Sequence, residues 1–169
     1  IGISADEKYY FINSSDHNTS EKYYFKTNEK LPKPKLVRKR EKGIIYSVSS
    51  WGDCFYIHTN KDAEDFKIER SKSLESNEWE VFIPSKDESM IGGLTFLNNW
   101  IIRSELTNAL DKIFVRDIKS NKEEELIFSD EEVYDASISH TQRDRNTDLI
   151  YISYSTPKTQ SRTYLYNLK

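Results

Sequence analysis

The chain has 169 residues, a mass of 20.0 kDa and a formal net charge of −3. This length allows one domain with a buried core, and an aromatic fraction of 13% argues against a disordered chain. The acidic balance excludes a general attraction to phosphate backbones or anionic lipid. We therefore predict neither a nucleic-acid partner nor a membrane partner.

The sequence begins Ile1-Gly2-Ile3, with no cationic leader and no apolar stretch of membrane-spanning length. On this basis we expect neither a signal peptide nor a transmembrane helix. Cys54 is the one cysteine, so neither an intrachain disulfide nor an all-cysteine zinc site can form. Together these features predict a reducing, cytoplasmic location.

Short apolar runs rich in Tyr, Phe, Ile and Val recur along the chain, with polar turns between them. Such runs favour β-strands, and no long stretch keeps the helical period. The starts of the four clearest runs are 46, 45 and 49 positions apart, which is the period of propeller blades. These runs are residues 9–12, 55–58, 100–103 and 149–153.

Each of the first three runs has companions that complete a four-stranded unit, and the last run has two companions. The earlier companions are residues 2–4, 46–49, 94–97 and 136–139, and the later ones are residues 22–25, 65–69, 112–116 and 163–166. A fourth strand is predicted at residues 35–37, 80–83 and 125–128. Four antiparallel strands per unit indicate an all-β protein made of β-propeller blades.

We predict three complete blades and most of a fourth in a single propeller segment. Because the last unit lacks a fourth strand and an open arc would expose strand edges, we expect a fragment of a larger propeller. A small closed ring of four blades is the alternative. The predicted blades are residues 1–40, 41–87, 88–132 and 133–169.

Catalytic and metal motifs are scarce. The nucleophile-elbow motif G-x-S-x-G is absent, and His17, His58 and His140 lie in no recognisable catalytic context. Residues 15–21 ("SDHNTSE") offer oxygen ligands, but such residues usually build the turn between two strands. We therefore predict no catalytic, cofactor-binding or metal-binding residue in this chain, and no cofactor.

Two segments carry concentrated charge. The basic segment, residues 30–43, could attract an anion, and the acidic segment, residues 123–135, could attract a cationic peptide. We interpret both as exposed outer strands with their connectors. Trp51, Trp79 and Trp100 are interpreted as packing residues.

The stretch at residues 77–105, "NEWEVFIPSKDESMIGGLTFLNNWIIRSE", resembles the propeller of the oligopeptidase B group in the prolyl oligopeptidase family of serine peptidases. The segments "INSSDHNTSE", "REKGIIYSV", "FYIHTNKDAEDFKI" and "YISYSTPKTQSRTYLYNL" resemble it in the same order, so the resemblance covers almost the whole chain. The chain departs from the family pattern at "YSTP", which is shortened, and at Glu64, where the family has Gly before the Phe strand. These departures affect turn geometry.

The resemblance implies a two-domain serine-type endopeptidase (protease II type) that cleaves short peptides after Arg or Lys. In that family a propeller covers an α/β-hydrolase domain that carries the Ser, Asp and His. The resemblance covers the propeller alone, so the catalytic domain is not present here and no catalytic residue is carried over. The partners implied are that catalytic domain and, for the whole enzyme, short basic oligopeptides.

The resemblance also implies a role for the segment. It would act as a gate that admits short peptides by size and is inactive alone, with the innermost strands near residues 46–49 and 94–97 lining the channel. The alternative is a stand-alone propeller-like module that binds a peptide or protein. An inactive gene remnant is a third reading.

Overall fold

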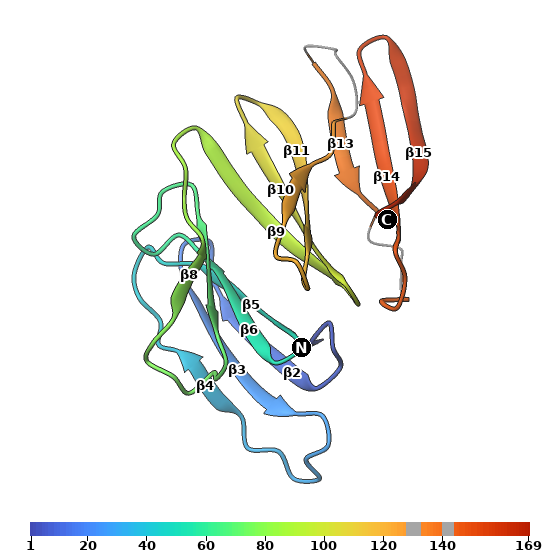
Figure 1. The fold of residues 1–169 in the computed structure, drawn as a ribbon. Helices are drawn as coiled ribbons and strands as arrows, with labels where there is room; N and C mark the ends of the chain where they lie inside the picture. The colour runs from blue at the N-terminus through green and yellow to red at the C-terminus, as the bar shows by residue number, and fades with distance from the viewer. Residues whose placement is uncertain (128–132, 140–143) are drawn as a thin grey trace. The chain divides into compact units, whose positions relative to one another are not determined.

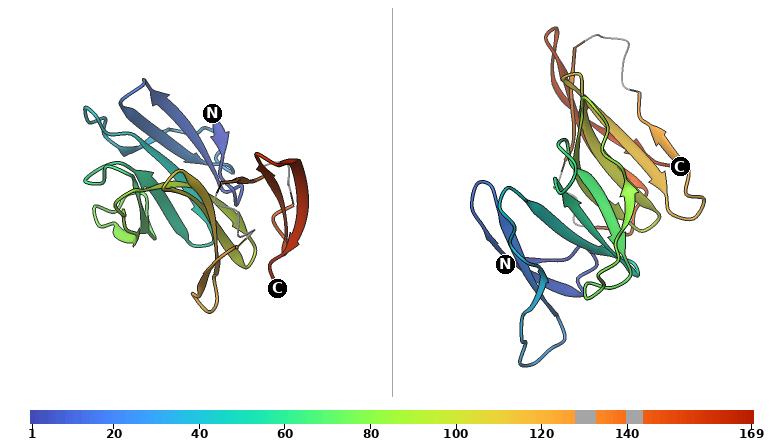
Figure 2. Two further views of the ribbon diagram at one scale, coloured as in Figure 1. Left: turned by 90° about the horizontal axis from the view of Figure 1, so that it is seen from above. Right: turned by 90° about the vertical axis from the view of Figure 1, so that its left-hand side faces the viewer.

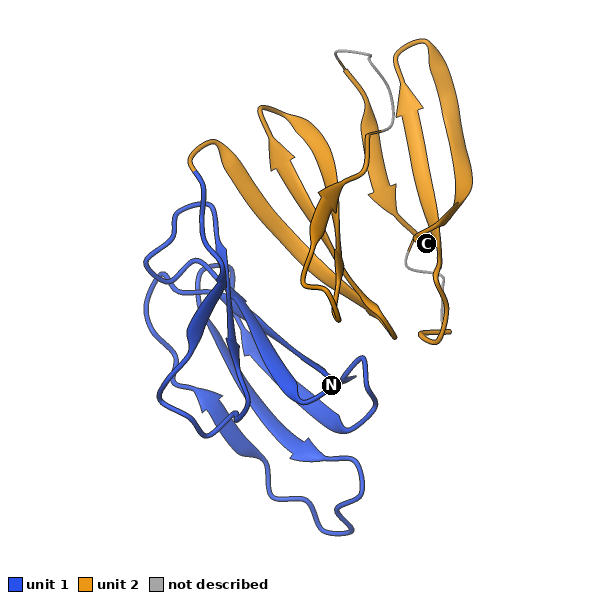
Figure 3. Cartoon of the chain, viewed as in Figure 1, with its two compact units in different colours: residues 1–86 blue, residues 87–169 orange. Residues whose placement is uncertain are grey.

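The computed structural model describes residues 1–127, 133–139 and 144–169. Every regular element in these ranges is a β-strand, which confirms the predicted all-β class (Figure 1). None of the described residues belongs to a helix long and apolar enough to cross a membrane. The chain divides into two compact units, unit 1 at residues 1–86 and unit 2 at residues 87–169 (Figure 3).

Unit 1 contains two four-stranded antiparallel sheets whose strands follow one another in chain order. The ribbons of Figures 1 and 2 show each sheet as a succession of neighbouring strands. The first sheet comprises β1 (Gly2–Ile3), β2 (Tyr9–Ser15), β3 (Ser20–Lys26) and β4 (Lys35–Arg38). The second comprises β5 (Tyr46–Trp51), β6 (Cys54–Thr59), β7 (Lys67–Ser71) and β8 (Glu80–Ile83).

Unit 2 repeats the arrangement with one four-stranded and one three-stranded antiparallel sheet. The third sheet of the chain comprises β9 (Ser89–Leu97), β10 (Trp100–Thr107), β11 (Leu110–Asp117) and β12 (Glu123–Glu125). The fourth comprises β13 (Asp135–Ile138), β14 (Leu149–Thr156) and β15 (Thr159–Asn167).

Two strand positions differ from the prediction. The strand predicted at residues 65–69 lies at Lys67–Ser71, because a turn in which the Phe66 N–H donates to the Ala63 carbonyl occupies the preceding residues. The outer strand predicted at residues 125–128 lies at Glu123–Glu125, where Glu123 is the pairing partner of Arg116. Residue 128 lies outside the described residues.

Two-residue loops fix the register of two hairpins. Gly52, with φ at 63°, begins the loop between the paired residues Trp51 and Cys54. Asn108 and Ala109, with φ at 50° and 62°, form the loop between β10 and β11. Positive φ at these positions matches the twist of the flanking strands, which is why such loops join hairpins.

The core of unit 1 lies between its two sheets. Phe11 and Tyr24 of the first sheet pack with Phe55 of β6 and with Leu74 of the loop after β7. All four side chains are buried. Tyr9 joins them with its ring centre 5.1 Å from that of Phe55 in an edge-to-face arrangement, which aromatic pairs prefer.

The core of unit 2 is aliphatic and lies between its two sheets. Leu97, Ile102 and Ile113 come from the third sheet, and Ile150 and Ile152 from the fourth. These five side chains are at most 1% exposed. Alternation along the strands places them on one face of each sheet, so each sheet contributes one apolar face to a shared core.

Candidate functional site

The first strand of each sheet lies at a sheet edge. The residues predicted to line a channel fall on such strands: residues 46–49 are in β5 and residues 94–97 are in β9. Within the described residues each of these strands has a sheet partner on one side, β6 and β10 respectively. The functional question is therefore which side chains gather along these edges.

Ser20 forms hydrogen bonds with Tyr46, the first residue of β5. The Tyr46 N–H donates to Oγ of Ser20 at 2.6 Å, and the Ser20 hydroxyl donates to the Tyr46 carbonyl at 3.2 Å. The Tyr46 hydroxyl accepts from the Lys22 N–H and donates to the Arg38 carbonyl, each at 2.9 Å. Tyr46 thus links its strand to β3 and β4 of the neighbouring sheet.

A pocket of about 380 Å³, which we call the histidine pocket, lies beside this edge. His17 and His58, two of the three histidines weighed from the sequence, both line it. Other lining residues are Asp16, Lys22 and Ser47. His140 lies outside the described residues. The structure therefore gathers polar candidates that are far apart in the sequence.

Asp16, which lines this pocket, stabilises the turn between β2 and β3 through its side-chain hydrogen bonds. Its Oδ1 accepts the Asn18 and Thr19 N–H groups at 3.0 and 2.8 Å and the Thr19 hydroxyl at 3.1 Å. The hydrogen bond from Asn18, followed by that from Thr19, lowers the pKa of Asp16. Its second oxygen lies 3.4 Å from Arg40. These contacts occupy the carboxylate that a catalytic histidine at this place would need.

Within the segment at residues 15–21, residues 16–19 form the turn, and the remaining residues belong to β2 and β3. Among the described residues no group of three or more His, Cys, Asp or Glu side chains is placed to hold a metal ion. Lys22 is partly buried at the pocket wall, where burial lowers its pKa, and its Nζ donates to Asn13 Oδ1 at 2.7 Å. The pocket is thus a polar recess with neither an assembled catalytic triad nor a metal cluster in this part of the chain.

Phe66 forms one wall of the histidine pocket under backbone strain. Its φ is 67°, which is unusual for a bulky residue, and its ring stacks on His58 with centres 4.6 Å apart. Glu64, which stands where the resembled pattern has a glycine, lies two residues before Phe66 in the same turn. Neither the place of Phe66 in the pocket lining nor its positive φ could be predicted from the sequence. Both depend on the turn before β7, which makes that strand begin at Lys67.

The two charged segments take part in ion pairs. Arg38 of the basic segment pairs with Glu69 at 2.6 Å. In unit 2 Glu123 of the acidic segment accepts from Arg103 at 2.8 Å and from Arg116 at 3.0 Å. Burial acts to raise the pKa of Glu123, but the charges and hydrogen bonds of both arginines outweigh it and the pKa is lowered. Of the acidic segment, residues 128–132 lie outside the described residues.

The tryptophans weighed as packing residues also make polar contacts. Nε1 of Trp79 donates to the Ser76 carbonyl at 3.1 Å, and Nε1 of Trp100 donates to Asp148 at 2.9 Å. Trp79 packs against the core of unit 1 and Trp100 against that of unit 2. Both therefore hold loops against the cores.

Consecutive antiparallel sheets of three or four strands, each beginning with an edge strand, define a run of β-propeller blades. The match to the family described as "Prolyl oligopeptidase, N-terminal beta-propeller domain" extends over residues 1–169. The chain belongs to this family, and the resemblance seen in the sequence is confirmed.

Comparison with individual relatives supports the same family. The chain is 29% identical over 161 residues to Protease 2 of Moraxella lacunata, covering 94% of this chain and 23% of the relative. Oligopeptidase B of Trypanosoma brucei, solved in a closed form with covalently bound antipain, is 27% identical with a TM-score of 0.89, covering 99% of this chain and 25% of that one. Oligopeptidase B of Leishmania major has the same fold, with a TM-score of 0.88 at 17% identity over 99% of this chain and 25% of that one. The chain thus spans about a quarter of the length of these relatives.

Proposed function

We propose that this chain is a non-catalytic propeller segment of a serine oligopeptidase that cleaves short peptides after Arg or Lys. The observation that carries the proposal is the match of all 169 residues to the N-terminal propeller of the prolyl oligopeptidase family. The 27% identity to an oligopeptidase B, at a TM-score of 0.89, supports the assignment to the oligopeptidase B branch of the family. The Ser, Asp and His would come from an α/β-hydrolase domain, which is the proposed partner.

The proposed role of the segment is to select substrates by size. A propeller over an active site admits flexible peptides, excludes folded proteins and removes water from the reacting groups. In this proposal the first strand of a blade faces the substrate, as β5 does in unit 1, and short basic oligopeptides pass along it. The histidine pocket lies beside β5, so it is a candidate contact for the peptide.

The outer face of the first sheet supports association with further blades. Cross-strand partners share a face of a sheet, and the pairs Ile3–Tyr10, Tyr10–Phe25 and Ile12–Tyr23 therefore lie on one face. Ile3 on this face is 52% exposed. An apolar face of this kind is expected to be covered in the working protein.

The fourth sheet has a similar face in unit 2. Tyr151 and Leu165 are cross-strand partners and are 41% and 56% exposed. This favours a segment of a larger propeller over the alternative of a stand-alone binding module. Because Cys54 is a free cysteine, we propose a reducing, cytoplasmic compartment for the protein.

The test is the apparent mass of the native polypeptide that carries this segment, measured by immunoblot of the source cells. We expect a band several times heavier than 20.0 kDa, together with hydrolysis of Arg-containing peptides by the immunopurified material. The 169-residue chain alone should not hydrolyse the same peptides. A native band at 20.0 kDa would contradict the proposal and favour the stand-alone module.

A further inference from the structure

A second pocket in unit 1, which we call the lysine pocket, lies between the first sheet and the loop that follows β7. Its volume is about 230 Å³. Tyr9, Tyr24, Phe55 and Leu74 give it an apolar lining, with the rings of Tyr9 and Tyr24 6.2 Å apart between centres. Ligand pockets for whole small molecules are usually larger than about 300 Å³, so this one suits a single anchoring side chain.

The charged side chains of the lysine pocket are mostly basic. Lys26, Lys33, Lys35 and Lys72 line it together with Glu29 and Glu75, which leaves a net charge of +2 in a chain whose own net charge is −3. A local charge opposite to that of the whole chain concentrates counter-charged ligands at one place.

The pocket's own carboxylates do not neutralise all of its lysines. Glu75 accepts from Lys35 at 2.6 Å and from the Tyr24 hydroxyl at 3.1 Å. The ammonium groups of Lys26, Lys33 and Lys72 make no hydrogen bond or ion pair with the described residues. Three cations therefore remain available beside an apolar recess.

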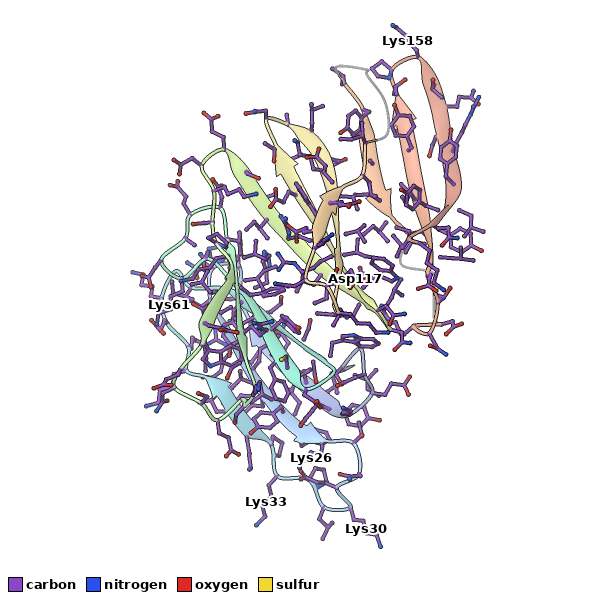
Figure 4. The ribbon with its side chains drawn as sticks, viewed as in Figure 1. Lys26, Lys30, Lys33, Lys61, Asp117 and Lys158 are labelled. Atoms are coloured by element: carbon purple, nitrogen blue, oxygen red, sulfur yellow. The ribbon has the colours of Figure 1, made fainter. Side chains whose placement is uncertain are left out.

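Figure 4 labels two lysines of the pocket, Lys26 and Lys33, and also labels Lys30 and Lys158, which lie outside it. Lys26, Lys30 and Lys33 lie at the same end of unit 1, and Lys30 and Lys33 project from the loop between β3 and β4. Lys30 is not part of the pocket lining. Lys158 lies in unit 2, on the loop between β14 and β15. Lys30 and Lys158 therefore provide controls that change charge without changing the pocket.

We propose that the lysine pocket binds an acidic segment of a partner protein, which places one aromatic side chain against the apolar lining formed by Tyr9, Tyr24 and Leu74. Carboxylates on either side of that aromatic residue pair with Lys26, Lys33 and Lys72. The site would disfavour the Arg- and Lys-containing peptides of the proposed enzyme, because their charge has the same sign as the pocket.

Fluorescence anisotropy of a labelled Glu-Asp-Phe-Glu-Asp peptide with the native polypeptide that carries this segment tests the proposal. Two double variants of equal charge change are compared: Lys26→Glu with Lys72→Glu in the pocket, and Lys30→Glu with Lys158→Glu outside it. The pocket variant should weaken binding by about tenfold or more at low salt, and the control by less than about twofold. Far-UV circular dichroism checks that both variants are folded.

Two further probes separate the aromatic anchor from general attraction. A peptide with Ala in place of Phe should bind at least about fivefold more weakly, because the apolar contact is lost. A short oligothymidylate of matched charge should bind more weakly than the peptide and should not distinguish the two variants. Equal loss in both variants, equal affinity of the Ala peptide, or tighter binding of the oligothymidylate would each overturn the proposal.

Discussion

Arg38 of β4 donates from Nη2 to Oε2 of Glu69 in β7 at 2.6 Å, so one ion pair joins the two sheets of unit 1. The Arg38 guanidinium also lies 4.9 Å from the ring centre of Trp79. Lys67 approaches the other Glu69 oxygen at 3.1 Å. Because the Glu69 side chain is only 11% exposed, this pair is shielded from solvent more than a typical surface salt bridge.

Glu69→Gln should destabilise the chain at neutral pH by about 1–3 kcal/mol, because two cations lose their buried negative partner and one of its two acceptor oxygens becomes an NH2 donor. Burial acts to raise the pKa of Glu69, but the hydrogen bonds and charges of Arg38 and Lys67 outweigh it, so the pKa lies below the ordinary glutamate value of 4.5. The stabilisation is therefore present above pH 4.5 and is lost as the pH falls through the lowered folded-state pKa. Urea unfolding at several pH values measures this.

The difference between wild type and Glu69→Gln should shrink below pH 4.5. Glu41→Gln is the matched control, because Glu41 pairs with Lys61 at 2.7 Å but is 48% exposed. Its effect should stay below about 0.5 kcal/mol. A difference for Glu69→Gln that is unchanged in acid would argue against a charge effect.

The inner strands of the fold could be predicted from the sequence because they are short, apolar and evenly spaced. Of the three predicted outer strands, those at residues 35–37 and 80–83 match β4 and β8, and the one in the third sheet is displaced. The prediction for the third sheet followed the apolar pair Leu126 and Ile127, whereas the strand is formed by Glu123–Glu125. The pairing of Glu123 with Arg103 and Arg116 decides this position, and such a contact has no local signal.

The two pockets could not be predicted for a similar reason. His17 and His58 line the same pocket because two hairpins pack together, and Lys72 reaches the lysine pocket from a loop far from Lys26 in the sequence. Composition suggested the basic segment. It could not indicate which lysines would be neutralised, as Lys35 is by Glu75, and which would remain available.

Tyr24 should titrate at an unusually high pH. Burial, followed by the hydrogen bond and charge of Glu75, raises the pKa of Tyr24 to about 12. Because a raised pKa favours the protonated form in the folded state, the stabilisation is present below pH 10 and is lost as the pH rises through about 12. Tyr24→Phe should flatten the fall in unfolding free energy over this range.

The measurement is urea unfolding at alkaline pH together with ultraviolet absorbance of tyrosinate. Tyr166→Phe, at a side chain that is 41% exposed, is the control for the loss of one phenol hydroxyl. If both variants changed the slope equally, the effect would belong to tyrosines in general and not to the Tyr24–Glu75 contact.

Ile152→Ala should destabilise unit 2 by about 2–5 kcal/mol, because it removes buried methyl groups and leaves a cavity. Ile152 is 1% exposed and packs with Ile102 and Ile113. Ile127→Ala removes the same atoms from a side chain that is 74% exposed, so its effect should be below about 0.5 kcal/mol. Urea unfolding followed by circular dichroism compares them, and equal effects would show that the core assigned to unit 2 is wrong.

Ala109→Gly should stabilise the chain. Ala109 has a φ of 62° in the loop between β10 and β11, and a left-handed conformation costs an L-residue roughly 1–2 kcal/mol. Glycine avoids that cost but loses about 0.5–1 kcal/mol through the greater freedom of its unfolded chain. The strain is the larger of the two, so a net gain of about 0.5–1 kcal/mol in unfolding free energy is expected.

Ala5→Gly is the matched control, because Ala5 also lies in a turn but is not among the residues with positive φ. There glycine brings the entropic cost without relieving strain, so this variant should be slightly less stable than wild type. Urea unfolding of both variants gives the comparison. An Ala109→Gly variant less stable than wild type would mean that the alanine side chain makes contacts worth more than the strain, and the loop would then be held by packing and not by its backbone.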